Sequence, residues 1–395
     1  MAKCAKIDQV KWIRLNTNIT AKLQAVHFPN SNTGDAADQR GITGYAAGAG
    51  GTILQTTDGG TNWTTLNSGT TNSLYSIYFP SLNDGYAVGA AGTILKTVNS
   101  GTSWATQISG TNNQLNSIYF TDTTTGYGVG SGGTILKTIN GGANWTSLTS
   151  GISDSLYSVY FTDANVGYTV GESGKIIKTT NGGTTWLAQA SGTINSLHSV
   201  RFINDTTGFA VGDRGTILKT MDGGTTWTAH NVPVSMFLTS IYFTDADTGY
   251  AAGANGAILK TTNGGTNWLV QNSGTSQNLS SVYFTAPNMG YAVGDSGTII
   301  GTKTNSGTGG INNLFSKDKP LKIYPNPSYD KVTVETSQIL TSGQLSITNL
   351  NGMELIRQQI IRSKTVVYIN GLSSGVYLVK FTNERTVQVG RFIKL

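Results

Sequence analysis

Three carboxylate side chains recur at one spacing in this sequence. Glu172 and Asp213 are 41 residues apart, and Asp295 follows Asp213 after twice that interval. A pair of carboxyl groups can act as acid and base on a glycosidic bond. These three acids are therefore the candidate catalytic residues, and together with Arg201 and Arg214 they form the candidate binding site.

A purely structural role competes with that interpretation. Aspartate before glycine is an ordinary turn residue, and Asp213 beside Arg214 can be a surface ion pair worth only ~0–1 kcal/mol. Binding is therefore favoured over catalysis for these positions.

Other catalytic and metal-binding patterns are missing. The sequence contains no nucleophile-elbow serine, P-loop or HExxH motif. His27, His198 and His230 lie in different repeat units, so we expect packed or surface rings instead of metal ligands. A single cysteine, Cys4, excludes a disulfide framework, an iron–sulfur cluster and a multi-cysteine zinc site. No metal and no cofactor are predicted.

The 41-residue interval belongs to an internal repeat. Three β-rich patterns, represented by "LYSIYF", "GYAVG" and "GTILKT", each occur seven times, and a fourth follows each periodic tryptophan. Four strands in a unit of about 40 residues are typical of a propeller blade. The tryptophans that keep the interval are Trp63, Trp104, Trp145, Trp186, Trp227 and Trp268.

We therefore predict an all-β fold with a seven-bladed β-propeller over residues 1–302. The seventh unit ends at Thr302 without a tryptophan strand, whereas Gln9 to Thr17 ("QVKWIRLNT") precedes the first unit. This N-terminal strand is expected to pair beside Gly297 to Thr302 and close the ring, which hides both edges. If the first strands are innermost, the turns that carry the candidate acids surround a mouth of the central channel.

The turn between the third and fourth strands reads "TTDGGTNW" or a close variant. An Asp or Asn side chain can bond to the backbone two residues on, the glycine pair accepts positive φ, and the tryptophan fills the space between blades. These turns resemble the Asp-box of bacterial neuraminidase-type (BNR) repeats, and the whole unit resembles the photosystem II stability/assembly factor-like propellers. The resemblance implies a folding role for Asp58, Trp63, Asn99, Trp104, Asn140, Trp145, Asn181, Trp186, Asp222, Trp227, Asn263 and Trp268.

Two enzyme families share this kind of repeat. Asp-box xyloglucanases place acid and base on propeller loops, which would suit the candidate acids. Sialidases need an arginine triad and are disfavoured, because arginines are scarce before the final domain. Those present are Arg14, Arg40, Arg201 and Arg214.

One unit is longer than the others. Ten extra residues fall between Phe28 and Tyr45, around Asp35. Insertions in repeats map to loops and sometimes carry binding function. Because this one is polar and has no aromatic anchor, a tolerated surface loop is favoured.

The period stops after Thr302, and residues 303–320 have the composition of a flexible linker. Runs such as "KVTVE" and "GVYLVKF" in residues 321–395 predict a small immunoglobulin-like β-sandwich. "IYPNP", "LSITNLNGMEL", "GLSSGVYLVKF" and the terminal "RFIKL" resemble the type A C-terminal sorting domain of type IX secretion. The resemblance implies that the type IX machinery is a partner and that the protein is exported.

Charge and hydropathy exclude two further classes. The whole net charge of +6 lies in the last 77 residues, so the propeller region lacks the basic footprint of nucleic-acid binding. The sequence contains no run of about 18 apolar residues, so no transmembrane segment is predicted. The N-terminus also lacks the apolar core of a signal peptide, which departs from the pattern of exported cargo.

We therefore expect a secreted or outer-membrane surface propeller that is not an enzyme and presents a rigid face to a protein or glycan. A glycoside hydrolase acting on polysaccharide is the first alternative. An assembly factor like the photosystem relatives is the second, and a sorting domain argues against it.

Overall fold

The computed structural model describes residues 11–15, 17, 19–29, 42–230, 232, 234–303, 321–335, 343–349, 354–360, 362–382 and 387–395. The chain divides into two compact units, Met1–Asn305 and Ser306–Leu395. Within the described residues, no helix is long and apolar enough to cross a membrane. The insertion around Asp35, Cys4 and nearly all of the predicted linker lie outside these residues.

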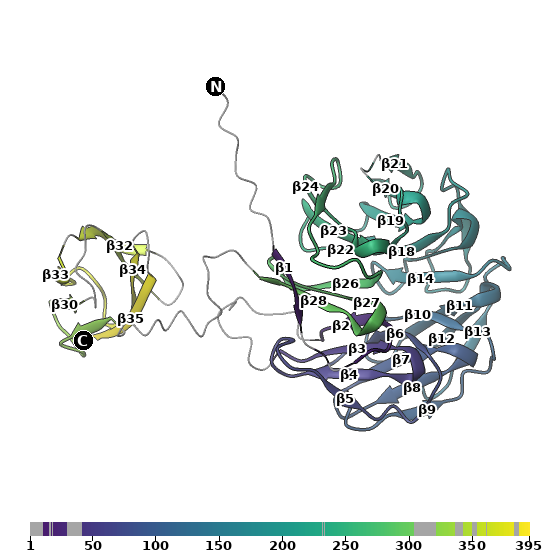
Figure 1. Cartoon of the computed structure of the whole chain (residues 1–395), viewed down its shortest axis with the longest axis horizontal. Helices are drawn as coiled ribbons and strands as arrows, with labels where there is room; N and C mark the ends of the chain where they lie inside the picture. Colours follow the sequence, from purple (N-terminus) through teal and green to yellow (C-terminus); the bar gives the residue numbers. More distant parts are fainter. Residues whose placement is uncertain are drawn as a thin grey trace. The chain divides into compact units, whose positions relative to one another are not determined.

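The first unit consists of seven antiparallel four-stranded sheets, which we number as blades 1 to 7 (Figure 1). The first strands of the blades are β2 (Leu23–His27), β6 (Leu74–Tyr78), β10 (Leu115–Phe120), β14 (Leu156–Phe161), β18 (Leu197–Phe202), β22 (Leu238–Phe243) and β26 (Leu279–Ala286). The second strands are β3 (Gly44–Gly48), β7 (Gly85–Gly89), β11 (Gly126–Gly130), β15 (Gly167–Gly171), β19 (Gly208–Gly212), β23 (Thr248–Gly253) and β27 (Met289–Gly294).

The third strands are β4 (Ile53–Thr56), β8 (Ile94–Thr97), β12 (Ile135–Thr138), β16 (Ile176–Thr179), β20 (Ile217–Thr220), β24 (Ile258–Thr262) and β28 (Ile299–Lys303). The outermost strands are β5 (Thr64–Leu66), β9 (Ala105–Gln107), β13 (Thr146–Leu148), β17 (Leu187–Gln189), β21 (Thr228–His230), β25 (Leu269–Gln271) and, in blade 7, β1 (Lys11–Leu15). Short 3-10 turns join second to third strands: η1 (Ala49–Gly51), η2 (Ala90–Gly92), η3 (Ser131–Gly133), η4 (Glu172–Gly174), η5 (Asp213–Gly215), η6 (Ala254–Gly256) and η7 (Asp295–Gly297).

The first strands lie innermost. Each contacts the first strand of the next blade, and β26 contacts β2, so the seven form a ring around a central channel. The N-terminal strand β1 pairs with β28, with Trp12 opposite Thr302. The all-β propeller fold expected from the repeat is confirmed, and its closing strand lies where the sequence places it.

Apolar clusters fill the spaces between blades. Between blades 1 and 2, for example, the buried side chains of Tyr45 and Phe79 stack at 3.9 Å, and Trp104 meets Phe79 edge to face. The phenylalanine ring covers the first glycine of the next strand: a Cβ on Gly85 would lie 2.3 Å from Phe79 Cε1. The "YF…GYAVG" pattern is therefore a packing requirement of the blade.

The second unit contains two antiparallel sheets. One has three strands in the order β29 (Lys322–Tyr324), β30 (Lys331–Glu335) and β33 (Lys364–Tyr368). The other has four, in the order β32 (Glu354–Ile360), β31 (Gly343–Thr348), β34 (Gly375–Thr382) and β35 (Val387–Lys394). Buried residues of both sheets, among them Val332, Ile347 and Phe392, share one core. The immunoglobulin-like topology stays a prediction.

Candidate functional site

The 3-10 turns that follow the second strands lie at one end of the channel. In blade 5, Gly212 pairs with Leu197 at the start of the inner strand, and Asp213 N donates to Ser196 O at 2.9 Å. Glu172 and Asp295 make the same backbone bond in blades 4 and 7, at 2.8 and 2.9 Å. We call this end, defined by turns η1 to η7, the turn side of the channel.

Glu172 and Asp213 approach a common aromatic residue on the turn side. Asp213 Oδ1 lies 2.5 Å from His198 Nε2, and the His198 ring stacks on Tyr157 with centroids 5.2 Å apart. Burial raises the pKa of Tyr157, and the charges of Glu172 and Asp213 raise it further. Glu172 also accepts a bond from Ser155 N at 3.3 Å. Blades 4 and 5 thus assemble one polar aromatic cluster, which we call the Tyr157 cluster.

The other candidate residues on the turn side stand apart from this cluster or point outward. Asp295, in blade 7, lies 3.3 Å from Lys22 Nζ and accepts a bond from Asn278 Nδ2 at 2.8 Å. Arg214 is exposed at the second position of its turn, where its φ is 56°. Asp295 is therefore a paired carboxylate two blades away from Asp213.

Arg201 lies at the opposite end of the channel. Its register partner is Phe209, whereas the turn side begins at Leu197, four residues earlier on the same strand. Its guanidinium lies between two phenol rings, 5.2 Å from the centroid of Tyr160 and 4.6 Å from that of Tyr242. The structure therefore separates Arg201 from the acids with which the sequence analysis grouped it.

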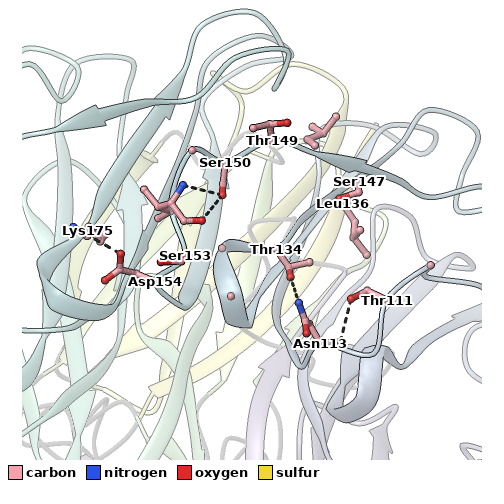
Figure 2. A pocket seen from close by; sticks show the side chains of 16 residues that line it. Thr111, Asn113, Thr134, Leu136, Ser147, Thr149, Ser150, Ser153, Asp154 and Lys175 are labelled. Atoms are coloured by element: carbon pink, nitrogen blue, oxygen red, sulfur yellow. Dashed lines mark hydrogen bonds and ion pairs between the residues drawn. The ribbon is translucent and has the colours of Figure 1, made fainter.

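A second group of charged residues was not found by sequence reasoning. A pocket of about 780 Å³ on the turn side is lined by parts of blade 3 and by Asp154 and Lys175 (Figure 2). There Asn113 Nδ2 donates to Thr134 Oγ1 at 2.8 Å, and the same bond recurs one blade earlier and two blades later. In blade 4 an ion pair at 3.8 Å, Asp154 with Lys175, takes its place.

The replacement of the asparagine–threonine pair by an aspartate–lysine pair is visible in the sequence. Asp154 and Lys175 are 21 residues apart, as are Asn113 and Thr134, so both positions depart from the repeat together. Comparing pairs of positions, instead of single positions, would have found it. Tyr157 was missed for a different reason: its position holds six residue types in seven blades, and tyrosine also occurs there in blade 2, so Tyr157 does not stand out from the repeat.

The Asp-box side chains use their oxygens within their own turn. Asp222 Oδ1 accepts bonds from Thr220 Oγ1 at 2.8 Å and Thr226 N at 2.9 Å, and Oδ2 accepts one from Thr226 Oγ1 at 2.7 Å. Backbone and side-chain bonds from Thr226 hold the pKa of Asp222 at about 2. A carboxylate so bonded supports the folding role expected for the boxes.

The boxes also tie neighbouring blades together. The hydroxyl of Tyr86 and the ammonium of Lys96, both in blade 2, donate to Gly141 O in the box of blade 3 at 2.8 and 2.6 Å. Blades 3 and 4 repeat this pair of bonds onto Gly182 O and Gly223 O respectively. For metals, the described residues contain no group of three or more His, Cys, Asp or Glu side chains that could hold an ion.

Comparison with known proteins supports both sequence resemblances. Residues 97–187 and 188–269 match the family model of the photosynthesis system II assembly factor YCF48, and residues 322–395 match the secretion system C-terminal sorting domain. Both expected resemblances are thereby confirmed, and the sorting domain implies export. No curated protein matched the sequence.

Solved structures share the fold at low identity. YCF48 bound to D1 peptide is 20% identical with a TM-score of 0.62, over 76% of this chain and 96% of its own. YCF48 from Cyanidioschyzon merolae is 18% identical with a TM-score of 0.62, over 75% and 99%. The GH74 enzyme of Niastella koreensis is 14% identical with a TM-score of 0.61, over 82% of this chain and 59% of its own. At these identities the likeness shows the propeller fold alone.

Proposed function

We propose that this chain is an exported, non-enzymatic propeller that binds a protein or glycan on the turn side of its channel. The supporting observation is the Tyr157 cluster, in which side chains that differ between blades gather where blades 4 and 5 meet. Residues needed by every blade of the scaffold recur at each equivalent position, whereas Glu172 and His198 recur in no other blade and Asp213 recurs only as Asp295. Scaffold packing therefore does not explain them. The sorting domain at residues 322–395 supports a secreted or outer-membrane surface location.

The chemistry of the cluster suits a polar ligand with a flat face. The stacked rings of Tyr157 and His198 offer a platform for a sugar ring or a side chain. The carboxylates of Glu172 and Asp213 beside them can accept hydroxyl or ammonium donors. YCF48 carries a peptide in a structure of the same fold, which supports a polypeptide as one form of ligand.

Glycoside hydrolysis is the second candidate, because the GH74 enzyme shares the fold and three acids stand on turn-side positions. Hydrolysis needs an acid and a second carboxylate facing each other across the bond. Here Asp213 lies within hydrogen-bond distance of His198, and Asp295 is ion-paired with Lys22 and accepts a hydrogen bond from Asn278. These partners favour binding over catalysis. A photosystem-type assembly role is the third candidate, and the sorting domain favours export over it.

A glycan array and a pull-down with the full chain test the proposal. Glu172→Gln and Asp213→Asn are expected to weaken binding at least about fivefold, which corresponds to about 1 kcal/mol. For Arg214→Ala, which lies on the same side but apart from the Tyr157 cluster, a smaller loss is expected. Asp58→Asn, a box variant on the other face, serves as the control and should bind as the wild type does. Equal effects of turn-side and box variants would contradict the face assignment. Release of oligosaccharide from any member of a polysaccharide panel would show that the chain is a glycoside hydrolase and would contradict the non-enzymatic proposal.

A further inference from the structure

The end of the channel opposite the turn side holds a cavity of about 400 Å³. Equivalent positions of the seven first strands supply its ring of side chains, and five of them are tyrosines. The ring consists of His27, Tyr78, Tyr119, Tyr160, Arg201, Tyr242 and Tyr283. We call this ring and the space it encloses the tyrosine cup.

Arg201 is the cation of this cup, and no described residue of the lining is a counter-ion for it. Among the described residues that line it, none is Asp or Glu. Burial lowers the pKa of His27 to about 4, and the charge of Arg201 lowers it further, whereas the bond that His27 Nε2 donates to Phe79 O raises it. The imidazole is therefore neutral at pH 7. The guanidinium thus supplies the only charge of the described lining, in surroundings that solvate it less well than water.

The two tyrosines beside Arg201 fix which ligand geometry it can accept. The rings of Tyr160 and Tyr242 both lie over the guanidinium within cation–π distance. A guanidinium packed against rings keeps its N–H groups directed outward in its own plane, as a two-pronged fork that matches a carboxylate. The cup therefore selects a planar anion over a spherical one.

Serines deeper in the cup add donors. Ser158 Oγ accepts a bond from Val200 N at 3.3 Å, and Ser199 and Ser240 make the corresponding bonds to the next blade. Since each oxygen already accepts a backbone N–H, its own hydroxyl hydrogen is left to be donated. A wall of hydroxyl donors and one cation favours an anion that accepts hydrogen bonds.

From this arrangement we propose that the tyrosine cup binds a monocarboxylate with a small aromatic or apolar body, clasped by Arg201. One cation balances one negative charge, whereas a dianion such as phosphate would leave an unpaired charge in a poorly solvated cavity. The phenol rings match a flat body, and the cavity volume lies in the range of small-ligand sites. This site is separate from the turn-side site and does not depend on the function proposed there.

Calorimetric titration of the full chain with benzoate at low salt tests the assignment. Arg201→Tyr is the informative variant, because it restores the residue that five other blades carry and should keep the fold. Benzoate affinity is expected to fall at least about tenfold in this variant, with an unchanged melting temperature. Arg201→Lys keeps the charge but loses the fork, so an intermediate affinity is expected. Arg14→Ala removes the same charge from an exposed position of β1, outside the cup and the turn-side site, and should have no effect.

Two ligand controls complete the test. Benzamide has the shape of benzoate without its charge and should bind at least about tenfold more weakly. Inorganic phosphate should not displace benzoate at equal concentration. The proposal is overturned if benzoate fails to bind the wild type, if it binds Arg201→Tyr equally well, or if phosphate competes with equal affinity.

Discussion

At the scale of single residues, the same side-chain type plays different parts according to which atoms its surroundings already use. The carboxylate of Asp222 is occupied by Thr220 and Thr226 of its own turn. The carboxylate of Asp213 instead meets a histidine from the neighbouring strand at a channel mouth. The position in the repeat thus distinguishes Asp222, an aspartate with a folding role, from Asp213, a candidate binding residue.

The box turn gives a first prediction. Asp222→Asn should leave the urea midpoint of unfolding nearly unchanged, because asparagine keeps the Oδ1 acceptor and four of the six boxes already carry it. Asp222→Ala removes the acceptor for Thr226 N and should lower the urea midpoint of unfolding. Urea denaturation of both variants measures the difference. Equal losses for Asn and Ala would show that the charge, and not the acceptor, holds the turn.

The neutral histidine of the tyrosine cup gives a second prediction. Burial lowers the pKa of His27 from 6.5 in the unfolded chain to about 4 in the folded one. Between these values the unfolded chain binds a proton that the folded chain does not, so stability falls as the pH decreases from 6.5 to 4. The loss should reach up to about 3 kcal/mol below pH 4 and be absent above pH 6.5.

His27→Tyr is the matched variant, since tyrosine is the residue of this position in five other blades. As the pH is lowered from 6.5 to 4, the free energy of unfolding of the wild type should decrease relative to that of this variant. Denaturant titration at several pH values measures the difference. Parallel pH profiles for the two proteins would contradict the assignment.

At the scale of elements, the propeller depends on β1, which among the described residues is the strand that completes the sheet of blade 7 beside β28. Trp12 on this strand is 3% exposed and meets Tyr250 and Phe284 edge to face. Inter-blade contacts of this kind recur at every junction, but here the tryptophan comes from the N-terminal strand, which pairs with the last strand of the repeat array. The closure is therefore the place where one strand affects the whole ring.

A third prediction follows for this closing strand. Deleting residues 1–16 should give an aggregated or strongly destabilised protein, and Trp12→Ala should cost about 3–5 kcal/mol. Trp63→Ala is the comparison, because Trp63 holds the equivalent position in blade 1 but is only partly buried, so a smaller loss is expected. Thermal melting and size-exclusion chromatography report both effects. Unchanged melting after the deletion would show that β1 does not close the ring.

At the scale of the whole molecule, the region that matches the sorting domain and the proposed binding sites lie in different units. The C-terminal unit has its own core and carries the entire net charge of +6, whereas the propeller region is neutral. Attraction between its basic strands and anionic partners in the secretion machinery or the cell surface would be screened by salt. The two units can therefore be tested separately.

A fourth prediction concerns this division. Residues 1–302 should fold alone, with the same melting transition and the same ligand binding as the full chain. Removal of the last six residues, "GRFIKL", should leave precursor inside a type IX-competent host when the chain is supplied with a signal peptide. Blots of cell, surface and medium fractions measure this. Surface delivery of the truncated chain would mean that the C-terminal unit serves a different purpose.

The sequence by itself determined the propeller. A 41-residue period with four β-rich runs fixes the blade, and the tryptophan strand that is missing after Thr302 but present at Trp12 fixes the closure. It also determined the sorting domain, whose motifs are contiguous. These conclusions follow because strand pairing within a blade is local and each repeat resolves the ambiguity of the others.

Only the tertiary structure decided which candidate residues meet. The repeat period assigns Arg201 and Asp213 to the same blade. Asp213 follows Gly212, the register partner of Leu197, and the four residues from Leu197 to Arg201 span roughly 13 Å of extended strand. Arg201 and Asp213 therefore lie at opposite ends of the channel. The same ring closure brings His27, from the first blade, beside Tyr283 of the last, with centroids 5.2 Å apart. Sites in a propeller form between blades, and the distances across a ring depend on its closed geometry instead of on separation along the chain.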